Sequence, residues 1–254
     1  LPMTRELEFR VIEEAVGGVA LDSAVLIYRG ANSTAFATVH PIHHDDAGAA
    51  SILPGRPMTM LAVARLAKRL GSARRPGGFV PMNLLYQDLT TMAWWVPPAR
   101  RHIWFRCTGG ELGAPERGES VPHPGLVFAA TSDRTWRVWA VKGCDRPSEA
   151  TPLFQAPYFN VYGTGAICQG NVDVPTGGFA ESVADRIEAW NKAFFDSFFT
   201  HPNTQGPLVN YKGGPYRFWR DMLDGRHAVF PESALVPLGT SLAQVLDRRG
   251  PDGG

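Results

Sequence analysis

The sequence predicts an α+β fold. Strand-like patterns fill the first 42 residues, helical spacing takes over at Met58–Leu70, and further strand candidates follow before a second helical stretch at about residues 179–199. The length of 254 residues allows either one large domain or a core of ordinary size with an added module. We expect a helix, an antiparallel meander and then a loop and further helices.

An N-terminal β module is predicted for residues 1–50, because a loop rich in Gly, Ala, His and Asp at residues 41–54 marks a boundary. Residues 51–254 are expected to form the core and a C-terminal helical extension. The strand candidates of the module are residues 7–12, 24–28 and 33–40.

A helix is predicted at Met58–Leu70, where apolar residues such as Leu61 and Leu66 recur at helical spacing. Pro57 stands where a helix starts and Gly71 where one stops. Strand candidates follow at residues 92–96, 102–105, 126–130 and 135–141.

Two segments are expected to be irregular. Residues 109–124 hold many Gly and Pro and predict a loop, and residues 151–178 predict an extended surface segment that carries Cys168. The helix at 179–199 has an apolar stripe at three- and four-residue steps, and short helices are expected around residues 216–219 and within 233–246. The stripe consists of Val183, Ile187, Trp190, Phe194 and Phe198.

The composition favours a cytoplasmic globular protein. Apolar residues make up 44% and charged residues 19%, and no window offers the ~20 apolar residues of a membrane span. The first residues lack the apolar core of a secretory signal. A net charge of +1 argues against nucleic acid as a partner. The cysteines, Cys107, Cys144 and Cys168, are odd in number without metal-ligand spacing, which fits a reducing compartment.

Cys168 is the candidate nucleophile, because a thiol on a Gly-rich, accessible loop can react as a thiolate. For a lone cysteine, the alternative of a buried structural thiol is the more common one. The neighbouring residues change that balance. The run Tyr158 to Cys168, with Asn160 eight positions before the cysteine and Gly165 and Ile167 between, resembles the active-site segment of ubiquitin-conjugating enzymes.

In that family, His-Pro-Asn precedes Gly-x-Ile/Val-Cys, so Tyr158 and Phe159 are departures from the pattern. The chain as a whole is similar to the protein B group of the bacterial ParB-related, ThiF-related (PRTRC) cassette, within the prokaryotic ubiquitin-conjugating superfamily. The resemblance implies a ubiquitin-conjugating (UBC-like) fold with the extra N-terminal module.

The resemblance also implies the chemistry. A ThiF-type activating enzyme would pass a ubiquitin-like protein to Cys168 as a thioester, and the carrier would transfer it to a protein or small acceptor without a cofactor. Asn160 would either stabilise the thioester oxyanion or brace the loop through backbone bonds. Asp173 would orient or deprotonate the acceptor, although a solvated turn residue is the commoner reading.

The predicted helix at Met58–Leu70 precedes the meander, where this superfamily docks its activating enzyme. Arg65, Lys68 and Arg69 would supply positive charge to that surface, although a charged helix face is usually only a solvated face. Two other functions remain open: a non-catalytic interaction module of the same cassette, and a cysteine hydrolase, which would need a general base beside the thiol.

Three further signals are weaker. A loop with metal-ligand residue types predicts a solvated loop and no metal site, because it has no matching ligand pair elsewhere. The tripeptide His201-Pro202-Asn203 copies the family motif, but no cysteine follows it, so it predicts a helix stop. The terminal Gly253-Gly254 indicates a flexible tail. The loop residues are His40, His43, His44, Asp45 and Asp46.

Overall fold

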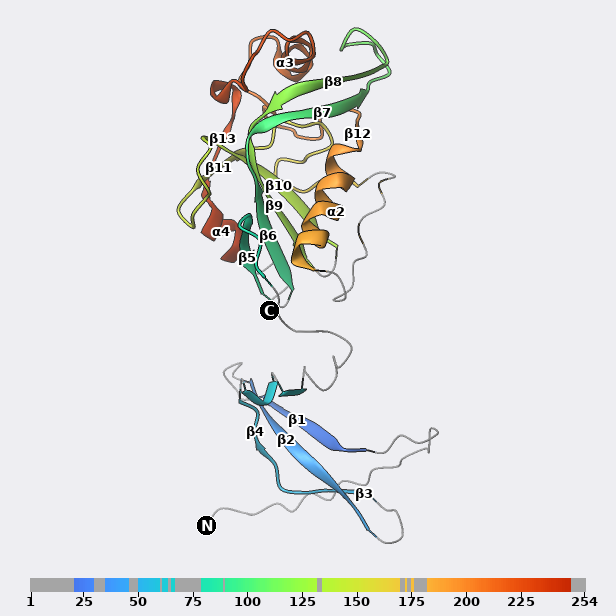
Figure 1. The fold of residues 1–254 in the computed structure, drawn as a ribbon, viewed down its shortest axis with the longest axis vertical. Helices are drawn as coiled ribbons and strands as arrows, with labels where there is room; N and C mark the ends of the chain where they lie inside the picture. Colours follow the sequence, from blue (N-terminus) through green and yellow to red (C-terminus); the bar gives the residue numbers. More distant parts are fainter. Residues whose placement is uncertain are drawn as a thin grey trace. The chain divides into compact units, whose positions relative to one another are not determined.

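The computed structural model confirms the α+β class, with mostly antiparallel strands and few helices (Figure 1). It describes residues 21–29, 35–45, 50–59, 61–63, 65–66, 79–88, 90–131, 134–169, 172, 175 and 182–247. Within these residues, no helix combines the length and the apolar character that crossing a membrane requires.

The chain divides into two compact units, Leu1–Gly77 and Gly78–Gly254. This division lies later than the module boundary predicted at residue 50. As a result, the helical residues 61–63 and 65–66 belong to the first unit.

The first unit contains a small antiparallel sheet in which β2 is the central strand. β2 pairs along its length with β1, in a register that runs from Ser23 opposite Pro41 to Arg29 opposite Ala35, and it also pairs with β3 and β4. The predicted strand at 7–12 lies outside the described residues. The strand bounds are β1 Ser23–Arg29, β2 Ala35–His44, β3 Ala50–Ile52 and β4 Arg56–Pro57.

The second unit is built on a six-stranded antiparallel sheet of order β13-β11-β10-β9-β6-β5. A three-stranded sheet of order β12-β7-β8 continues from it. The bounds of the large sheet are β5 Leu84–Gln87, β6 Thr91–Val96, β9 Gly125–Thr131, β10 Trp136–Val141, β11 Pro152–Gln155 and β13 Pro237–Ser241. Those of the small sheet are β7 Ala99–Arg106, β8 Glu116–His123 and β12 Phe198–Phe199.

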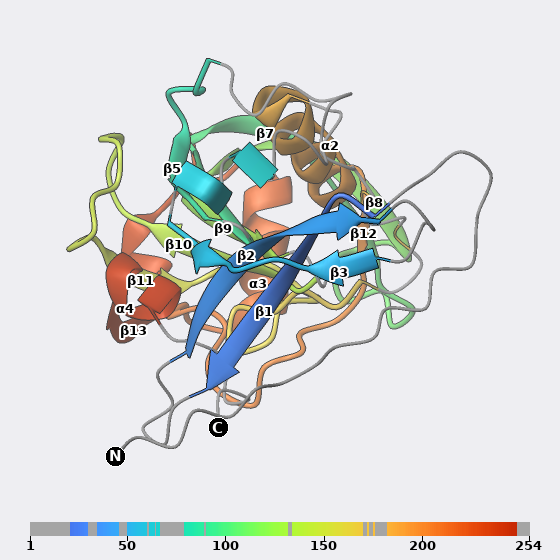
Figure 2. The same ribbon diagram turned by 90° about the horizontal axis from the view of Figure 1, so that it is seen from below.

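Alternation along the central strands explains why the large sheet is buried on both faces. In β6, Trp94 belongs to one apolar cluster and its neighbour Ala93 to a second, and in β9 Phe128 and Val127 divide in the same way. Helix α2 (Val183–Phe195) packs on the first cluster and α4 (Leu242–Asp247) on the second. Figures 1 and 2 show these two helices on opposite sides of the sheet.

Helix α2 begins with a capping box, in which the Ser182 hydroxyl accepts from the Asp185 N–H and the Asp185 carboxylate accepts from the Ser182 N–H. Its buried residues Ile187, Trp190 and Phe194 confirm most of the predicted stripe. The prediction that this helix continues to residue 199 is wrong. The helix ends at Phe195, and Phe198–Phe199 forms β12, parallel to β7.

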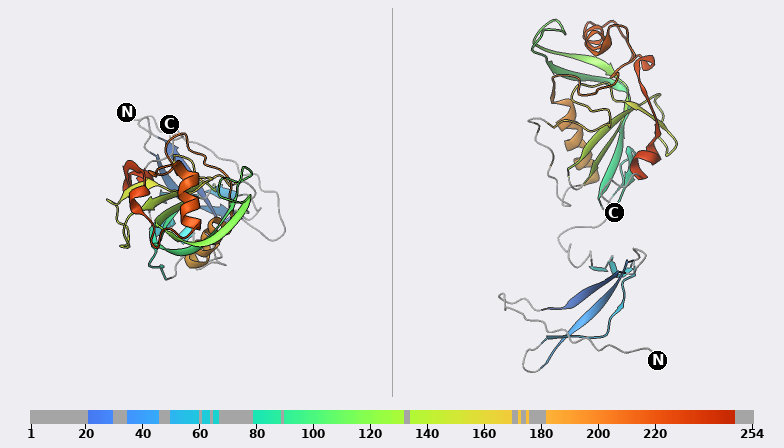
Figure 3. Two further views of the ribbon diagram at one scale, coloured as in Figure 1. Left: turned by 90° about the horizontal axis from the view of Figure 1, so that it is seen from above. Right: turned by 180° about the vertical axis from the view of Figure 1, so that it is seen from behind.

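Three other expectations need correction. Residues 109–124 are not all loop, because β8 forms there at a sheet edge, where a proline such as Pro122 is tolerated. Residues 151–178 are not only a surface segment, because β11 inserts between β10 and β13. The C-terminal stretch adds β13 to the expected short helices, which are α3 (Gly214–Leu223), η1 (Glu232–Ala234) and α4. Helix α3 packs beside β8 (Figure 3).

Candidate functional site

The candidate site is the loop that follows β11, and its first residues are anchored in the core. The Gln155 N–H donates to the Val236 carbonyl oxygen at 2.8 Å, and the buried indole N–H of Trp219 donates to the Pro157 carbonyl oxygen at 2.7 Å. These bonds tie the loop to the residue before β13 and to α3, so the loop leaves the sheet in a fixed direction.

Tyr158 and Phe159, which depart from the family tripeptide, are both fully buried. Tyr158 packs edge-on against Phe194 of α2, and Phe159 packs against Phe105 of β7. They replace the family's polar and cyclic residues with aromatic anchors. These two side chains therefore anchor the start of the loop in the core, directly before Asn160.

The Tyr158 hydroxyl reaches a buried histidine, His123, at 2.7 Å from Nδ1. His123 Nε2 lies 3.2 Å from the Arg101 carbonyl oxygen, which can only accept, so the proton sits on Nε2 and the phenol donates to Nδ1. Burial, followed by the nearby Arg101 charge, lowers the pKa of His123 to about 3. Burial also raises the pKa of Tyr158. Both groups are therefore neutral, as a buried pair requires.

Beyond Asn160 the chain folds into a short hairpin. Val161 bridges to Ile167, and the Tyr162 N–H donates to the Ala166 carbonyl oxygen at 2.8 Å. The hairpin also pairs with β10, because the Val138 N–H donates to the Gly165 carbonyl oxygen at 2.8 Å. Gly165 has a φ of +82°, and a Cβ there would lie 2.5 Å from the indole nitrogen of the buried Trp139, so only glycine fits.

The same pairing carries Cys168 to the end of the hairpin, opposite Asn160. The Cys168 N–H donates to the Asn160 carbonyl oxygen at 2.7 Å, and the side chain is partly exposed. Side chains alternate along the paired residues, so Tyr162 and Cys168 share one face while the buried Val161 lies on the other. The structure therefore brings the two principal predicted residues together.

Tyr162 is a neighbour of the thiol that sequence reasoning missed. Its hydroxyl lies within hydrogen-bonding reach of Cys168, and this contact, with the charge of the thiolate, raises the pKa of Tyr162. The signal was the turn sequence Gly163-Thr164-Gly165, because a turn there pairs the residues on its two sides.

Asn160 has a left-handed backbone, with a φ of +62°, and its side chain is bound to the segment after α2. Its Nδ2–H donates to the Phe198 carbonyl oxygen at 2.9 Å. Its Oδ1 accepts from both the Thr200 N–H at 3.2 Å and the Thr200 hydroxyl at 2.8 Å. The Asn160 N–H donates to the His201 carbonyl oxygen at 3.0 Å. These bonds fix the Asn160 side chain and backbone against residues 198–201.

The other two cysteines differ from Cys168. Cys107 is buried, its thiol donates to the Thr200 carbonyl oxygen at 3.1 Å, and burial raises its pKa to about 11. It is therefore a neutral structural thiol at physiological pH. Cys144 is exposed and lies outside the candidate loop.

The structure describes only some of the remaining predicted residues. Asp173, Lys68, Arg69 and the predicted metal-type residue Asp46 lie outside the described residues. Arg65 is exposed on the helical residues of the first unit.

The histidines of the first unit lie on β2 and make local contacts. His40 Nδ1 lies 2.8 Å from the Leu53 carbonyl oxygen, and His44 Nε2 lies 2.9 Å from the Leu21 carbonyl oxygen. In the part of the chain that the structure describes, no group of three or more His, Cys, Asp or Glu side chains is arranged to hold a metal ion.

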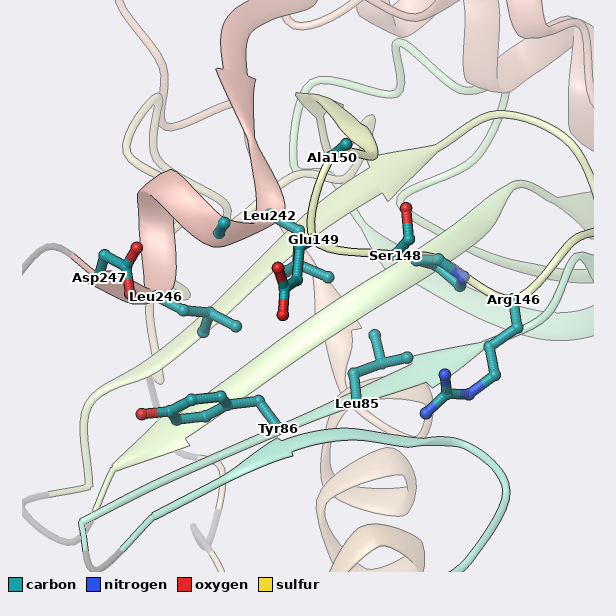
Figure 4. Close-up of a pocket in the computed structure, with 11 residues that line it drawn as sticks. Leu85, Tyr86, Arg146, Ser148, Glu149, Ala150, Leu242, Leu246 and Asp247 are labelled. Carbon is teal, nitrogen blue, oxygen red and sulfur yellow. The ribbon is translucent and has the colours of Figure 1, made fainter.

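A groove of about 630 Å³ lies elsewhere in the second unit, between β5, residues 146–150 and α4 (Figure 4). Its lining includes the carboxylates of Glu149 and Asp247 and the apolar side chains of Leu85 and Leu246. None of its lining residues belongs to the loop that carries Cys168. The groove and the thiol are therefore separate features.

The fold and the loop together define an α+β protein that presents a partly exposed thiol at the end of an anchored hairpin. The chain belongs to prokaryotic E2 family D, which it matches over residues 60–238. Searches of curated proteins and of solved structures give no match. The matched range contains Asn160 and Cys168, and it confirms the resemblance to bacterial ubiquitin-conjugating (E2) proteins. An E2-like role in bacterial ubiquitin-like conjugation follows at the family level.

Proposed function

We propose that the protein is a carrier enzyme that accepts a ubiquitin-like protein on Cys168 and transfers it to an acceptor. The observation that carries this proposal is the partly exposed thiol held opposite Asn160 by the 2.7 Å backbone bond. Membership of prokaryotic E2 family D supports it. On this proposal, the second unit is the UBC-like core, and the sheet of the first unit is an addition to it.

The first step is thiol exchange. The Cys168 thiolate attacks the carbonyl carbon of the thioester that joins the ubiquitin-like protein to the activating enzyme. The tetrahedral intermediate collapses as the activating enzyme's thiolate leaves, so one thioester replaces another. The exchange is nearly balanced in energy, and its rate depends on thiolate access, which the partial exposure of Cys168 provides.

The second step is discharge to an acceptor. An acceptor amine attacks the same carbonyl carbon, the Cys168 thiolate leaves, and the amine loses a proton to solvent or a base, which gives an amide. Negative charge develops on the carbonyl oxygen before collapse. Asn160, whose backbone carbonyl oxygen accepts from the Cys168 N–H, is proposed to donate to the thioester oxygen through its side-chain amide. Asp173 is proposed as the residue that orients the acceptor amine.

The test is reconstitution. Incubation with a ThiF-type activating enzyme, ATP and a ubiquitin-like protein is expected to give an adduct that a thiol reductant cleaves, and the adduct should vanish in Cys168→Ala. The matched control is Cys144→Ser, which removes an exposed thiol elsewhere and should leave the adduct intact. An adduct that persists in Cys168→Ala would overturn the carrier assignment. Absence of any adduct in the wild type would favour a non-catalytic module.

A further inference from the structure

The segment that follows α2 carries the tripeptide His201-Pro202-Asn203, which the sequence explains only as a helix stop. In the structure this segment lies against the candidate loop. Besides the bonds to Asn160, a Cβ on Gly163 would lie 3.3 Å from the Thr204 hydroxyl, so residues 200–204 run beside the start of the hairpin. The segment therefore does more than end the helix.

The hydrogen bonds fix which atom donates at each contact. The Phe198 carbonyl oxygen can only accept, so it sets the Asn160 amide with nitrogen toward β12 and oxygen toward Thr200. The Thr200 hydroxyl has one proton, and it donates that proton to Asn160 Oδ1. Toward His201 Nδ1, 2.9 Å away, the same hydroxyl must accept. His201 therefore carries a proton on Nδ1.

The result is a directed chain of donors from His201 Nδ1–H to the Thr200 hydroxyl and on to Asn160 Oδ1. Donors polarise one another along such a chain, so a donor to the carbonyl oxygen of an amide makes its N–H groups better donors. Asn160 Nδ2 gives one of its two protons to the Phe198 carbonyl oxygen. Its second proton remains for a further acceptor.

The fixed position of Thr200 is independent of its hydroxyl. Its carbonyl oxygen accepts from the Cys107 thiol at 3.1 Å, and its N–H also donates to Asn160 Oδ1. The backbone of His201 is likewise tied to the Asn160 N–H. The hydroxyl thus adds its bonds with Asn160 Oδ1 and His201 Nδ1 to a segment that backbone and thiol contacts already hold. Its removal should change the Asn160 amide more than the fold.

We propose that Thr200 is a positioning residue, which, with His201 Nδ1–H behind it, orients and polarises the Asn160 amide for the thioester oxygen during discharge. The proposal rests on the proposed carrier function. On this proposal, His201 of the His201-Pro202-Asn203 tripeptide contributes to the site by donating to the Thr200 hydroxyl. Thr200 acts only through Asn160 and touches no reacting atom.

The test compares Thr200→Val, which removes the hydroxyl at nearly constant shape, with Thr200→Ser, which keeps it. Single-turnover discharge of the charged protein to free lysine should slow roughly fivefold in the valine variant, the size of one hydrogen bond. The serine variant should discharge near the wild-type rate, and charging by the activating enzyme should be unchanged in both. A valine variant that discharges like the wild type would overturn the proposal.

Two further measurements separate this proposal from the carrier assignment. In an Asn160→Ala background, Thr200→Val should slow discharge no further, because Thr200 acts through Asn160. NMR of the uncharged protein needs no partner: the Asn160 side-chain amide signals should shift in Thr200→Val and return in Thr200→Ser. If the wild type forms no thioester, the carrier function fails. If the amide signals do not move in Thr200→Val, the positioning role fails.

Discussion

The N–H of Cys168 donates to the carbonyl oxygen of Asn160 at 2.7 Å, although the two residues are eight positions apart. The bond closes the hairpin that carries the thiol, and its acceptor belongs to a residue with a φ of +62°. The position of the thiol is therefore coupled to the backbone of Asn160, and a substitution at either residue should change the local structure at the other.

Replacing Cys168 by serine should change the chemistry of the adduct. A serine hydroxyl that takes the acyl group forms an oxygen ester, so a slowly formed adduct should survive thiol reductant and break in alkali. The measurement is gel electrophoresis with and without reductant. Cys107→Ala, which removes the thiol whose pKa burial raises to about 11, should still give the reductant-sensitive adduct. A reductant-sensitive adduct on the Cys168→Ser protein would place the thioester on another cysteine.

Asn160→Gly and Asn160→Ala should differ in stability. Both lose the side-chain bonds to Phe198 and Thr200, but only glycine adopts a positive φ without cost. We expect the alanine protein to be less stable than the glycine protein by ~1 kcal/mol in urea unfolding, the usual penalty of a left-handed backbone. Equal stabilities would mean that the backbone of Asn160 relaxes in the variants.

Gly165→Ala should disrupt the hairpin. The new Cβ would lie 2.5 Å from the indole of Trp139, which is buried and cannot move aside, and φ there is +82°. Overpacking of this kind costs ~1–3 kcal/mol. Gly163→Ala is the matched control, because residue 163 is exposed and its Cβ would meet only the Thr204 hydroxyl at 3.3 Å. We expect faster alkylation of Cys168 by iodoacetamide in the first variant, and a rate unchanged from the wild type in the second.

The loop that carries Cys168 shows what the sequence can predict and what it cannot. Asn160, Gly165, Ile167 and Cys168 form a local motif, and local spacing is enough to identify it. The residues that brace Asn160 come from β12 and the segment behind it, about forty positions later in the chain. Such long-range contacts depend on tertiary packing, which periodicity does not encode.

The strands also divide into those that local sequence predicts and those that depend on distant partners. β6, β9 and β10 are rich in apolar and aromatic residues and were predicted, because a sheet buried on both faces gives continuous apolar runs. β8 contains Gly118 and Pro122 and lies at an edge, and β11 pairs with β13 from the far end of the chain. In these strands the partner, rather than the local composition, determines the structure.

The buried pair of His123 and Tyr158 should make stability depend on pH. The folded protein keeps His123 neutral down to its lowered pKa of about 3, because the imidazole is buried. The unfolded chain takes up a proton on this residue below about pH 6.5. Stability should therefore fall as the pH drops from 6.5 toward 3, by ~1.4 kcal/mol per unit from this one group.

Urea unfolding at several pH values measures that slope. His123→Phe removes the group, so its acid dependence should be shallower by that amount, even if the variant is less stable at every pH. His102→Phe is the control, because His102 is exposed on β7 and should leave the slope unchanged. An unaltered slope in His123→Phe would contradict the assignment.

Charge reversal of Arg65, Lys68 and Arg69 tests the proposed docking surface for the activating enzyme. If these residues form it, the triple glutamate variant should be charged roughly tenfold more slowly at low salt, because opposite charges speed encounter. The difference should shrink as salt screens the charges. Lys192→Glu with Lys212→Glu, two exposed positions of the second unit, is the control and should be charged normally. Discharge of protein that is already charged needs no activating enzyme, so its rate should be equal in all variants. A charging rate equal to that of the wild type in the triple variant would show that the activating enzyme docks elsewhere.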